Sequence, residues 1–269
     1  MKEKDIKTVV KEKYGQIAVQ SDESANSGCC CGPSSSCCGS GYTVFSESYE
    51  TLDGYNADAD LGLGCGIPTD YAGISKGDSV LDLGSGAGND CFVARALVGD
   101  GGHVTGLDFT EEMVEKARKN ASKLGYDNVE FVYGDIEEMP FGSNSFNVVI
   151  SNCVLNLVPD KRKAFSEIFR VLKAGGHFSV SDVVIKGELP DKLKEDAEMY
   201  AGCVSGAVQI EDYLDLIQDA GFKEIIIQKQ RNIDLPETLL GNYLSGNEIE
   251  TFLKGDTGII SITVTAYKK

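Results

Sequence analysis

A short apolar stretch that runs directly into a glycine-rich turn constrains the fold more than any other segment. Residues 79–83, Ser-Val-Leu-Asp-Leu, predict a buried strand, and residues 84–88 read Gly-Ser-Gly-Ala-Gly. A helical stripe of apolar side chains follows at Phe92, Val93, Ala96 and Leu97. A strand, a glycine turn and a helix in this order form a binding corner at the carboxyl edge of a parallel sheet.

Strands and helices then alternate along the chain. Further strands are predicted at 103–107, 129–133, 146–150 and 177–181. We expect Thr110 to cap the helix after the second strand, with Arg118 and Lys119 in its last turn. The helix before the fifth strand is expected to end at Gly175-Gly176. This alternation predicts an α/β fold with a parallel, doubly wound sheet.

Both ends of the chain add elements to this sheet. Residues 1–20 predict an amphipathic helix, and residues 21–41, rich in Ser, Gly and Cys, predict a mobile loop. Further helices are predicted near 191–201, 211–220 and 237–253, and a further strand at 224–228. Residues 260–266 alternate between apolar and polar side chains, which predicts a last strand.

The net charge and the lack of long apolar runs narrow the choice of partners. The chain of 269 residues carries a net charge of −17, which opposes binding to nucleic acid or to an anionic membrane. No run of about 18 apolar residues occurs, and no apolar stretch follows Met1, so we expect neither a membrane span nor a signal peptide. We therefore expect a cytoplasmic protein, in which thiols stay reduced. Nine cysteines in such a protein favour ligands or catalysts over structural bridges.

The glycine turn and three acidic residues at successive strands indicate a nucleoside-like ligand. The spacing is Gly-x-Gly-x-Gly, not the Gly-x-Gly-x-x-Gly of a dinucleotide site, which favours a ligand without pyrophosphate. Asp82 lies in the first strand, and Asp108 ends the second, where it can accept both hydroxyls of a ribose. Asp135 follows the third strand, where it can accept an adenine amino group while Ile136 packs on the ring. A plain strand–helix turn is the alternative for the glycine motif alone.

These segments resemble the S-adenosylmethionine-dependent methyltransferases that have a seven-stranded sheet. The resemblance rests on residues 80–88, 106–108 and 134–141 and spans about residues 72–185. It implies a class I, Rossmann-like, mostly parallel sheet whose last strand, at 258–267, is antiparallel. It also implies S-adenosylmethionine as the cofactor, bound by residues near the strand ends: Asp82, Gly84, Gly86, Gly88, Asp108, Asp135, Ile136 and Asn152.

Three of the nine cysteines stand apart from apolar neighbours. Cys65 lies between two glycines, Cys153 follows the fourth strand, and Cys203 lies beyond the fifth. These positions predict that the three thiols converge at the carboxyl edge of the sheet, where they would hold a soft, thiophilic atom. The alternative is that each cysteine is a small buried hydrophobe. We assign Cys91, beside Phe92 on the helix after the glycine turn, to packing for that reason.

The contexts of these cysteines resemble those of the arsenite methyltransferases. The matching segments are 62–68, 83–90, 151–157 and 202–207, within a span of about 42–210. The resemblance implies trivalent arsenic as the substrate, with Cys65, Cys153 and Cys203 as its ligands and as the catalytic residues. It also implies a thiol reductant such as thioredoxin or glutathione, and a further cysteine, Cys37 or Cys38, that relays thiols.

The resemblance also divides the chain into three regions. They are an N-terminal helix, cysteine-rich loop and lid at 1–71, a cofactor-binding core at 72–185, and a C-terminal region at 186–269 that completes the sheet and the arsenic site. The lid is expected between Tyr42 and Tyr55, where the resemblance places aromatic contacts to the cofactor.

The chemistry of trivalent arsenic suits three thiolates on physical grounds. Arsenic bound by three thiolates is a pyramid, and the lone pair at its open apex can attack a sulfonium methyl group in line. No general base is needed, because arsenic carries no proton to lose. Catalysis would come mainly from holding the two reactants together, which can be worth roughly 7–11 kcal/mol. We therefore expect His103 and His177 to be structural or surface residues.

Two other functions stay open. Residues 134–141 also resemble methyltransferases that act on a carbon atom of a quinone precursor, and such enzymes need no set of three thiols. A protein that binds a metalloid without catalysis would keep the same fold. The cluster of Cys29, Cys30, Cys31, Cys37 and Cys38 is open as well: it relays thiols, collects a soft metal, or forms a disordered, redox-sensitive loop.

Overall fold

The computed structural model describes residues 3–26, 46–187, 207–233, 245–249 and 257–269. Several sequence predictions fall outside these ranges. They concern the helix at 191–201, most of the helix at 237–253, the loop cysteines between 29 and 38, and Cys203. Within the described part of the chain, no helix is both long and apolar enough to cross a bilayer.

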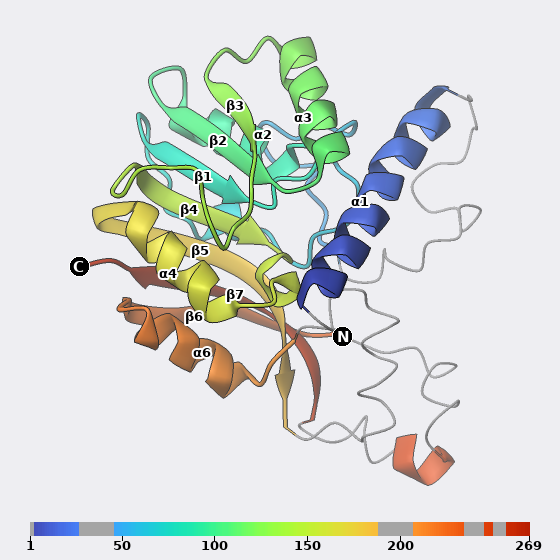
Figure 1. The fold of residues 1–269 in the computed structure, drawn as a ribbon, viewed down its shortest axis with the longest axis vertical. Coiled ribbons are helices and arrows are strands. Elements are labelled where there is room, and N and C mark those ends of the chain that lie inside the picture. The colour runs from blue at the N-terminus through green and yellow to red at the C-terminus, as the bar shows by residue number, and fades with distance from the viewer. Residues whose placement is uncertain (1–2, 27–45, 188–206, 234–244, 250–256) are drawn as a thin grey trace.

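A seven-stranded sheet forms the centre of the molecule (Figure 1). Its strands lie in the order β3-β2-β1-β4-β5-β7-β6. They are β1 (Ser79–Leu83), β2 (His103–Asp108), β3 (Val129–Tyr133), β4 (Phe146–Asn152), β5 (Leu172–Lys186), β6 (Lys223–Asn232) and β7 (Gly258–Tyr267). The first five pair in parallel, and β7 runs antiparallel to both of its neighbours. This arrangement confirms the predicted class I, Rossmann-like sheet with an antiparallel last strand.

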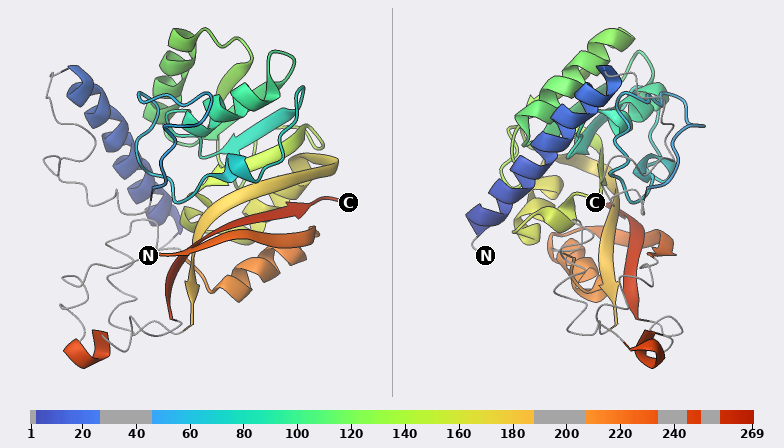
Figure 2. Two further views of the ribbon diagram at one scale, coloured as in Figure 1. Left: turned by 180° about the vertical axis from the view of Figure 1, so that it is seen from behind. Right: turned by 90° about the vertical axis from the view of Figure 1, so that its right-hand side faces the viewer.

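Helices cover both faces of the sheet (Figure 2). On one face lie α2 (Asn89–Val98) and α3 (Glu111–Leu124), and on the other α4 (Lys161–Val171) and α6 (Ile210–Asp219). The first face packs around the ring of Phe92, which meets Phe131 edge to face at 6.0 Å. The second packs around Phe165 and Tyr213, whose ring centroids are 5.4 Å apart. The N-terminal helix α1 (Glu3–Asn26) lies beside α3.

Three of the expected element boundaries are wrong. Helix α1 continues to Asn26, so residues 21–26 are helical rather than part of a loop. Helix α3 continues to Leu124, which leaves Lys123 as the basic residue of its last turn in place of Arg118 and Lys119. Its end coincides with Gly125 in the left-handed conformation, at φ +67°, a common way for a helix to stop.

The predicted end of α4 is the third error. The helix stops at Val171, and Leu172 is already extended and paired with Phe146 of β4. Gly175 and Gly176 therefore lie within β5, where their backbones bond to Lys268 near the chain end. The strand thus begins three residues before the glycine pair, at Leu172, whose side chain is buried in the core.

Two local predictions on helices also differ from the structure. Thr110 occupies the N-cap position of α3, but its side chain makes no capping bond; its backbone N–H instead bonds to Asp108 Oδ1 at 2.8 Å. On α2 the buried face consists of Cys91, Phe92, Val93, Ala94 and Val98, whereas Leu97 is 40% exposed. The helix is thus rotated by about one position from the predicted stripe.

Both faces of β7 are buried, and each has its own role. The apolar side chains of Ile260 and Ile262 join the core under α4 and α6. The polar side chains face a loop instead, because Ser261 Oγ donates to the carbonyl oxygen of Cys65 at 2.6 Å. On the neighbouring β5, Ser179 Oγ donates to the carbonyl oxygen of Pro68 at 2.8 Å. The polar alternation predicted for the last strand therefore fastens residues 65–68 to the sheet.

The glycine at 106 allows a test of the packing between β2 and β3. A Cβ atom at Gly106 would lie 2.6 Å from the Phe131 ring and 2.7 Å from Ser85 Oγ. We expect Gly106→Ala to lower the free energy of unfolding by about 1–3 kcal/mol, as overpacking of a core does. Gly101→Ala is the matched control, since a Cβ there meets nothing within 4 Å. Urea denaturation followed by circular dichroism measures both variants, and equal midpoints would show that the Phe131 contact is unimportant.

Candidate active site

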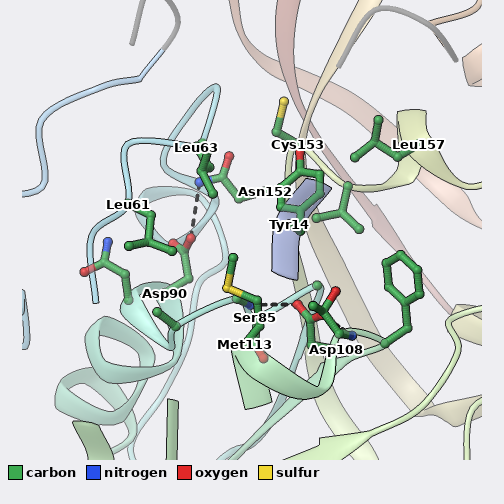
Figure 3. Close-up of a pocket in the computed structure, with 18 of the residues that line it drawn as sticks. Tyr14, Leu61, Leu63, Ser85, Asp90, Asp108, Met113, Asn152, Cys153 and Leu157 are labelled. Carbon is green, nitrogen blue, oxygen red and sulfur yellow. Dashed lines mark hydrogen bonds between the residues drawn. The ribbon is translucent and has the colours of Figure 1, made fainter. Parts of the chain in front are cut away.

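The carboxyl ends of β1, β2 and β4 open into one cavity (Figure 3). Asn152 and Cys153 lie at one end of it, and Asp108 and Met113 lie toward the other. Its lining includes four groups of residues: Gly84, Ser85 and Gly86 after β1; Asp108, Phe109 and Thr110 after β2; Asp135 and Ile136 after β3; and Asn152, Cys153 and Val154 after β4. Segments far apart in the sequence therefore meet at the edge of the sheet that the glycine turn predicted.

The glycine turn is held in place by the neighbouring strand end. The backbone N–H groups of Gly84 and Ser85 both donate to the carbonyl oxygen of Leu107. Gly84 has a φ of +68°, and a Cβ there would lie 2.4 Å from Val154, so only glycine fits. Asp108 Oδ2 accepts the N–H of Gly86 at 2.9 Å, which ties the turn to β2. This backbone surface is open to the cavity and is free of side chains that would keep a ligand away.

The acidic residues predicted for the cofactor differ in their surroundings. Asp108 is buried, and burial raises the pKa of its carboxyl group even though backbone N–H groups bond to it. Asp135 lines the cavity too, but its Oδ2 is 2.6 Å from Lys7 Nζ on α1. Asp82 and Gly88 do not line the cavity. Asp82 is instead buried beneath it and accepts a bond from Cys91 Sγ at 3.2 Å. Their roles in cofactor binding stay predictions.

The thiol of Cys91 is buried in the core under α2, as the packing assignment expected. Its hydrogen bond to Asp82 was not foreseen. Burial raises the pKa of Asp82 well above its ordinary value, and the charge of Asp90 raises it further. Burial likewise raises the pKa of the Cys91 thiol, with Asp82 as the next cause. Neither member of this pair lines the cavity, and burial disfavours the charged form of each.

The turn that carries Cys65 packs tightly on the ends of two strands. The N–H of Cys65 donates to Asn152 Oδ1 at 3.0 Å, and its carbonyl oxygen accepts the bond from Ser261. A Cβ at Gly64 would lie 2.5 Å from Asn152 Nδ2, and one at Gly66 would lie 2.7 Å from Ser181 Oγ. Glycine on each side of Cys65 therefore allows the turn to reach β4 and β5.

Cys153 lies directly beyond the end of β4 and borders the cavity. Its φ of +60° is unusual for a residue with a side chain, and its N–H donates to the carbonyl oxygen of Ser181 at 2.7 Å. Such strained backbone conformations are concentrated at functional sites.

The thiols of Cys65 and Cys153 are both buried and both act on Tyr213. Burial is the main reason why the pKa of Tyr213 is raised well above its ordinary value, and Asp182 and the two cysteines each add to the shift. The structure thus brings these two predicted cysteines into electrostatic range of one hydroxyl group. Cys203 lies outside the described residues, so the convergence of all three thiols stays a prediction. Among the described residues, no three His, Cys, Asp or Glu side chains form a metal-binding group.

Two residues that border the cavity, the buried Tyr49 and the partly buried Asp90, were not named as site residues. Tyr49 Oη lies 2.8 Å from Asp90 Oδ1, and Asn152 Nδ2 lies 3.2 Å from Asp90 Oδ2. Burial raises the pKa of Asp90 to about 6, against the hydrogen bonds from Tyr49 and Asn152, which lower it. In the sequence, Asp90 is marked only by its position in the first turn of the helix after the glycines. An acidic residue is common there because it interacts favourably with the helix dipole, so this position does not by itself indicate a binding site. Tyr49 falls within the predicted lid.

Helix α1 also contributes to the cavity, which the sequence did not indicate. Lys7, Val10 and Tyr14 line it, and Lys7 bonds to Asp135 and Glu137, each at 2.6 Å. In Figure 3, α1 passes behind the cavity with Tyr14 pointing toward it. The apolar spacing of residues 1–20 predicted the helix correctly, but amphipathicity does not reveal which surface a helix covers.

Comparisons with known proteins agree with this fold and site. The model of the methyltransferase domain family matches residues 74–221, more than half of the chain. The fold and the cavity thus define a methyltransferase domain.

Two relatives narrow the family. An arsenite methyltransferase of Halobacterium salinarum is 41% identical over 267 aligned residues, which cover 91% of this chain and 66% of that protein. The crystal structure of an arsenic(III) S-adenosylmethionine methyltransferase from Chlamydomonas reinhardtii matches with a TM-score of 0.63 at 35% identity, and the match covers 76% of this chain and 67% of that one. The chain belongs to the arsenite methyltransferase family.

The matches cover only part of the length of the relatives. The chain spans between 40% and 66% of the length of five curated arsenite methyltransferases that it matches. A demethylmenaquinone methyltransferase of Listeria monocytogenes is 38% identical over 109 residues, which cover 40% of this chain and 46% of that protein.

A buried carboxyl group on β5, that of Asp182, should make stability depend on pH. Asp182 Oδ2 accepts a bond from Tyr213 Oη at 2.9 Å, and burial raises the pKa of Asp182 from 3.8 to about 7. The folded protein therefore holds a proton that the unfolded chain releases, so this group stabilises the fold at low pH, and the contribution falls as pH rises from about 4 to about 7. We expect the free energy of unfolding of wild type, relative to Asp182→Asn, to fall across that window by roughly 1.4 kcal/mol per unit of pKa difference.

Urea denaturation at a series of pH values measures this difference. Asp212→Asn, at an exposed position on α6 next to Tyr213, gives the response of a surface carboxyl group. A difference between wild type and Asp182→Asn that is constant from pH 4 to pH 8 would contradict the assignment.

Proposed function

We propose that this chain is an S-adenosylmethionine-dependent methyltransferase that transfers a methyl group to trivalent arsenic held by Cys65, Cys153 and Cys203. The observation that carries the proposal is the junction at Asn152. Asn152 accepts the N–H of Cys65, while Cys153 is the next residue along the chain and borders the cavity. Cys153 thus borders a cavity of the methyltransferase type, and the turn of the buried Cys65, whose neighbour Gly64 lines that cavity, is bonded to the residue before Cys153. Membership of the arsenite methyltransferase family supports the same substrate.

The residues of the cavity fit the methyl donor. Gly84 and Gly86 offer bare backbone at the strand end, and Asp108 presents a carboxylate whose orientation is fixed by the N–H groups of Gly86 and Thr110. A carboxylate held in this way suits the two hydroxyls of a ribose. Ile136 presents a largely buried apolar side chain to the cavity, which suits the face of an adenine ring. When bound, S-adenosylmethionine supplies a methyl group on a positively charged sulfur.

The charge of the cavity suits a cationic ligand as well. Its described lining holds one basic side chain, Lys7, against five acidic ones: Glu47, Asp60, Asp90, Asp108 and Asp135. Negative charge around a cavity with low-dielectric walls concentrates cations there.

The thiols would hold arsenic by their softness and position it by their geometry. Three thiolates leave the lone pair of trivalent arsenic at the open apex of a pyramid, and that pair forms the new bond from arsenic to the methyl carbon. The bond from this carbon to sulfur breaks, and its electrons stay on the sulfur of the leaving thioether. Arsenic is left two electrons more oxidised, so a dithiol reductant such as thioredoxin, or glutathione, must restore the trivalent state. We propose that Cys37 or Cys38 relays these thiols.

No acid–base residue is required by this chemistry, and the two histidines are placed accordingly. His103 pairs with Glu130 with 45% of its side chain exposed, and His177 Nε2 is bonded to the carbonyl oxygen of Ala72. Neither residue lines the cavity. The chain's contribution to the reaction is therefore to exclude water and to hold the reactants, for which Cys65 at 0% and Cys153 at 3% exposure are suited.

Single cysteine-to-serine variants test the assignment of the ligands. We expect Cys65→Ser, Cys153→Ser and Cys203→Ser each to lower arsenite methylation by about 100-fold or more, since loss of one ligand misplaces the arsenic. Cys91→Ser is the matched control, because its hydroxyl can replace the thiol in the bond to Asp82. Incubation with arsenite, methyl donor and a dithiol, followed by product speciation, measures all four.

The same variants separate the competing functions. Methylation of a quinone precursor that survives Cys153→Ser would favour the quinone methyltransferase, and binding of arsenite without transfer of radioactive methyl would favour a metalloid-binding protein. Full arsenite turnover in any of the three ligand variants would refute the proposed site.

Asp108 provides a test of the cofactor site that does not depend on arsenic. In Asp108→Asn one carboxylate oxygen becomes an amide N–H that opposes the N–H of Gly86 or Thr110. We expect the affinity for S-adenosylhomocysteine to fall about tenfold or more, in line with the loss of a charge-assisted hydrogen bond. Isothermal titration calorimetry measures it, with Asp215→Asn on the exposed side of α6 as the control. Unchanged affinity would remove Asp108 from the ribose site.

A further inference from the structure

The buried Tyr49 and the partly buried Asp90 and Asn152 form a hydrogen-bond network between the cavity and the Cys65 turn. Tyr49 Oη lies 2.8 Å from Asp90 Oδ1 and 3.0 Å from the carbonyl oxygen of Gly66. Asn152 Nδ2 lies 2.8 Å from that same carbonyl oxygen, 2.8 Å from Tyr49 Oη and 3.2 Å from Asp90 Oδ2. Asn152 Oδ1 accepts the N–H groups of Cys65 and Gly66 at 3.0 and 3.3 Å. In Figure 3 a dashed line marks the hydrogen bond between Asn152 and Asp90.

The network has fewer hydrogens than acceptor positions. Asn152 Nδ2 carries two hydrogens and Tyr49 carries one, while the acceptors within reach are the Gly66 carbonyl, both oxygens of Asp90 and the oxygen of Tyr49 itself. The single hydrogen of Tyr49 must therefore go either to Asp90 or to Gly66. The charge on Asp90 decides between these two arrangements, because an ionised carboxylate is the stronger acceptor.

We propose that Tyr49, Asp90 and Asn152 are positioning residues that couple the charge in the methyl-donor cavity to the placement of the Cys65 turn. This inference rests on the proposed function. A cation in the cavity stabilises the ionised form of Asp90, which draws the Tyr49 hydrogen toward it. Asn152 then donates to Gly66 and accepts from Cys65, so that one side chain holds both sides of the Cys65 turn. The cationic donor thus favours the thiol arrangement that binds arsenic, and the neutral thioether left after transfer does not.

The surroundings of Asp90 support a switch at this position. Asp90 lines the cavity, and burial raises its pKa to about 6, so a nearby positive charge, which lowers that pKa, increases the ionised fraction of Asp90 at mildly acidic pH. The turn has anchors that do not belong to the network, since Ser261 Oγ and Arg231 Nη2 both donate to the Cys65 carbonyl oxygen. Removing one hydroxyl from the network should therefore alter the coupling without releasing the turn from the sheet.

Calorimetric titration of the full chain with arsenite tests the coupling. The titration is made under three conditions: without a second ligand, with saturating sinefungin, and with saturating S-adenosylhomocysteine. Sinefungin carries an ammonium group where the donor has its sulfonium, whereas S-adenosylhomocysteine is neutral at that atom. For wild type we expect sinefungin to raise arsenite affinity about fivefold or more, as coupling between two sites commonly does, and S-adenosylhomocysteine to raise it less. In Tyr49→Phe and in Asp90→Asn we expect both ligands to have the same effect.

Tyr71→Phe is the matched control, since it removes a hydroxyl near the same segment from a residue that does not line the cavity. It should retain the wild-type difference between sinefungin and S-adenosylhomocysteine. Circular dichroism and the urea midpoint establish that each variant is folded.

The outcomes separate this inference from the proposed function. If wild type binds neither arsenite nor the two analogues, the proposed function fails and the inference with it. If wild type binds all three and methylates arsenite, but Tyr49→Phe keeps the difference between the analogues, only the inference is overturned. The inference is also overturned if the variants lower arsenite affinity by the same factor with sinefungin as with S-adenosylhomocysteine. A purely structural role of these residues would produce that result.

Discussion

The fastening of one loop to two strand ends is the interaction on which the site depends. Residues 65–68 reach the sheet only because polar side chains of β5 and β7 bond to their carbonyl groups, and because glycine flanks Cys65 on both sides. Asn152 adds the lateral connection to β4. The loop is thereby fixed to the sheet, and the backbone of Cys65 is bonded to Asn152, the last residue of β4 before Cys153.

Electrostatics gives the cavity its second constraint. The buried Asp82 and Asp108 and the partly buried Asp90 surround one glycine turn, and desolvation raises the pKa of each of them. Concentrating carboxyl groups in this way opposes folding of the empty protein, because each group must either be desolvated while charged or hold a proton. A cationic ligand relieves that penalty. The protein is therefore less stable when the cavity is empty than when a positively charged ligand occupies it.

The sequence was informative where the signal is local and silent where it depends on contacts across the fold. The glycine turn, Asp108 and the alternating strands were predictable, because each follows from backbone conformation or from periodicity within a few residues. Tyr49 and the covering role of α1 were not, because nothing adjacent to Tyr49 reveals that Asn152, 103 residues later, is its partner. The end of α4 was predicted wrongly because Gly175-Gly176 is a typical helix stop. In the structure the helix ends earlier, at Val171, and Leu172 already pairs with Phe146 of β4. Cys65, Cys153 and Cys203 were identified by their glycine, asparagine and proline neighbours. The bond from Ser261, on the polar side of β7, to the backbone of Cys65 was not predicted.

The insertion of β7 between β5 and β6 has a consequence for biosynthesis. Ser261, which anchors the Cys65 turn, is 196 positions further along the chain than the residue it anchors. A nascent polypeptide can form β1 to β5 while the C-terminal strand is still within the ribosome, but the thiol loop has no complete docking surface until that strand emerges. During this interval the Cys65 turn lacks its bond to Ser261. The docking of that turn therefore depends on the synthesis of β7, and not only on that of the nucleoside-binding half.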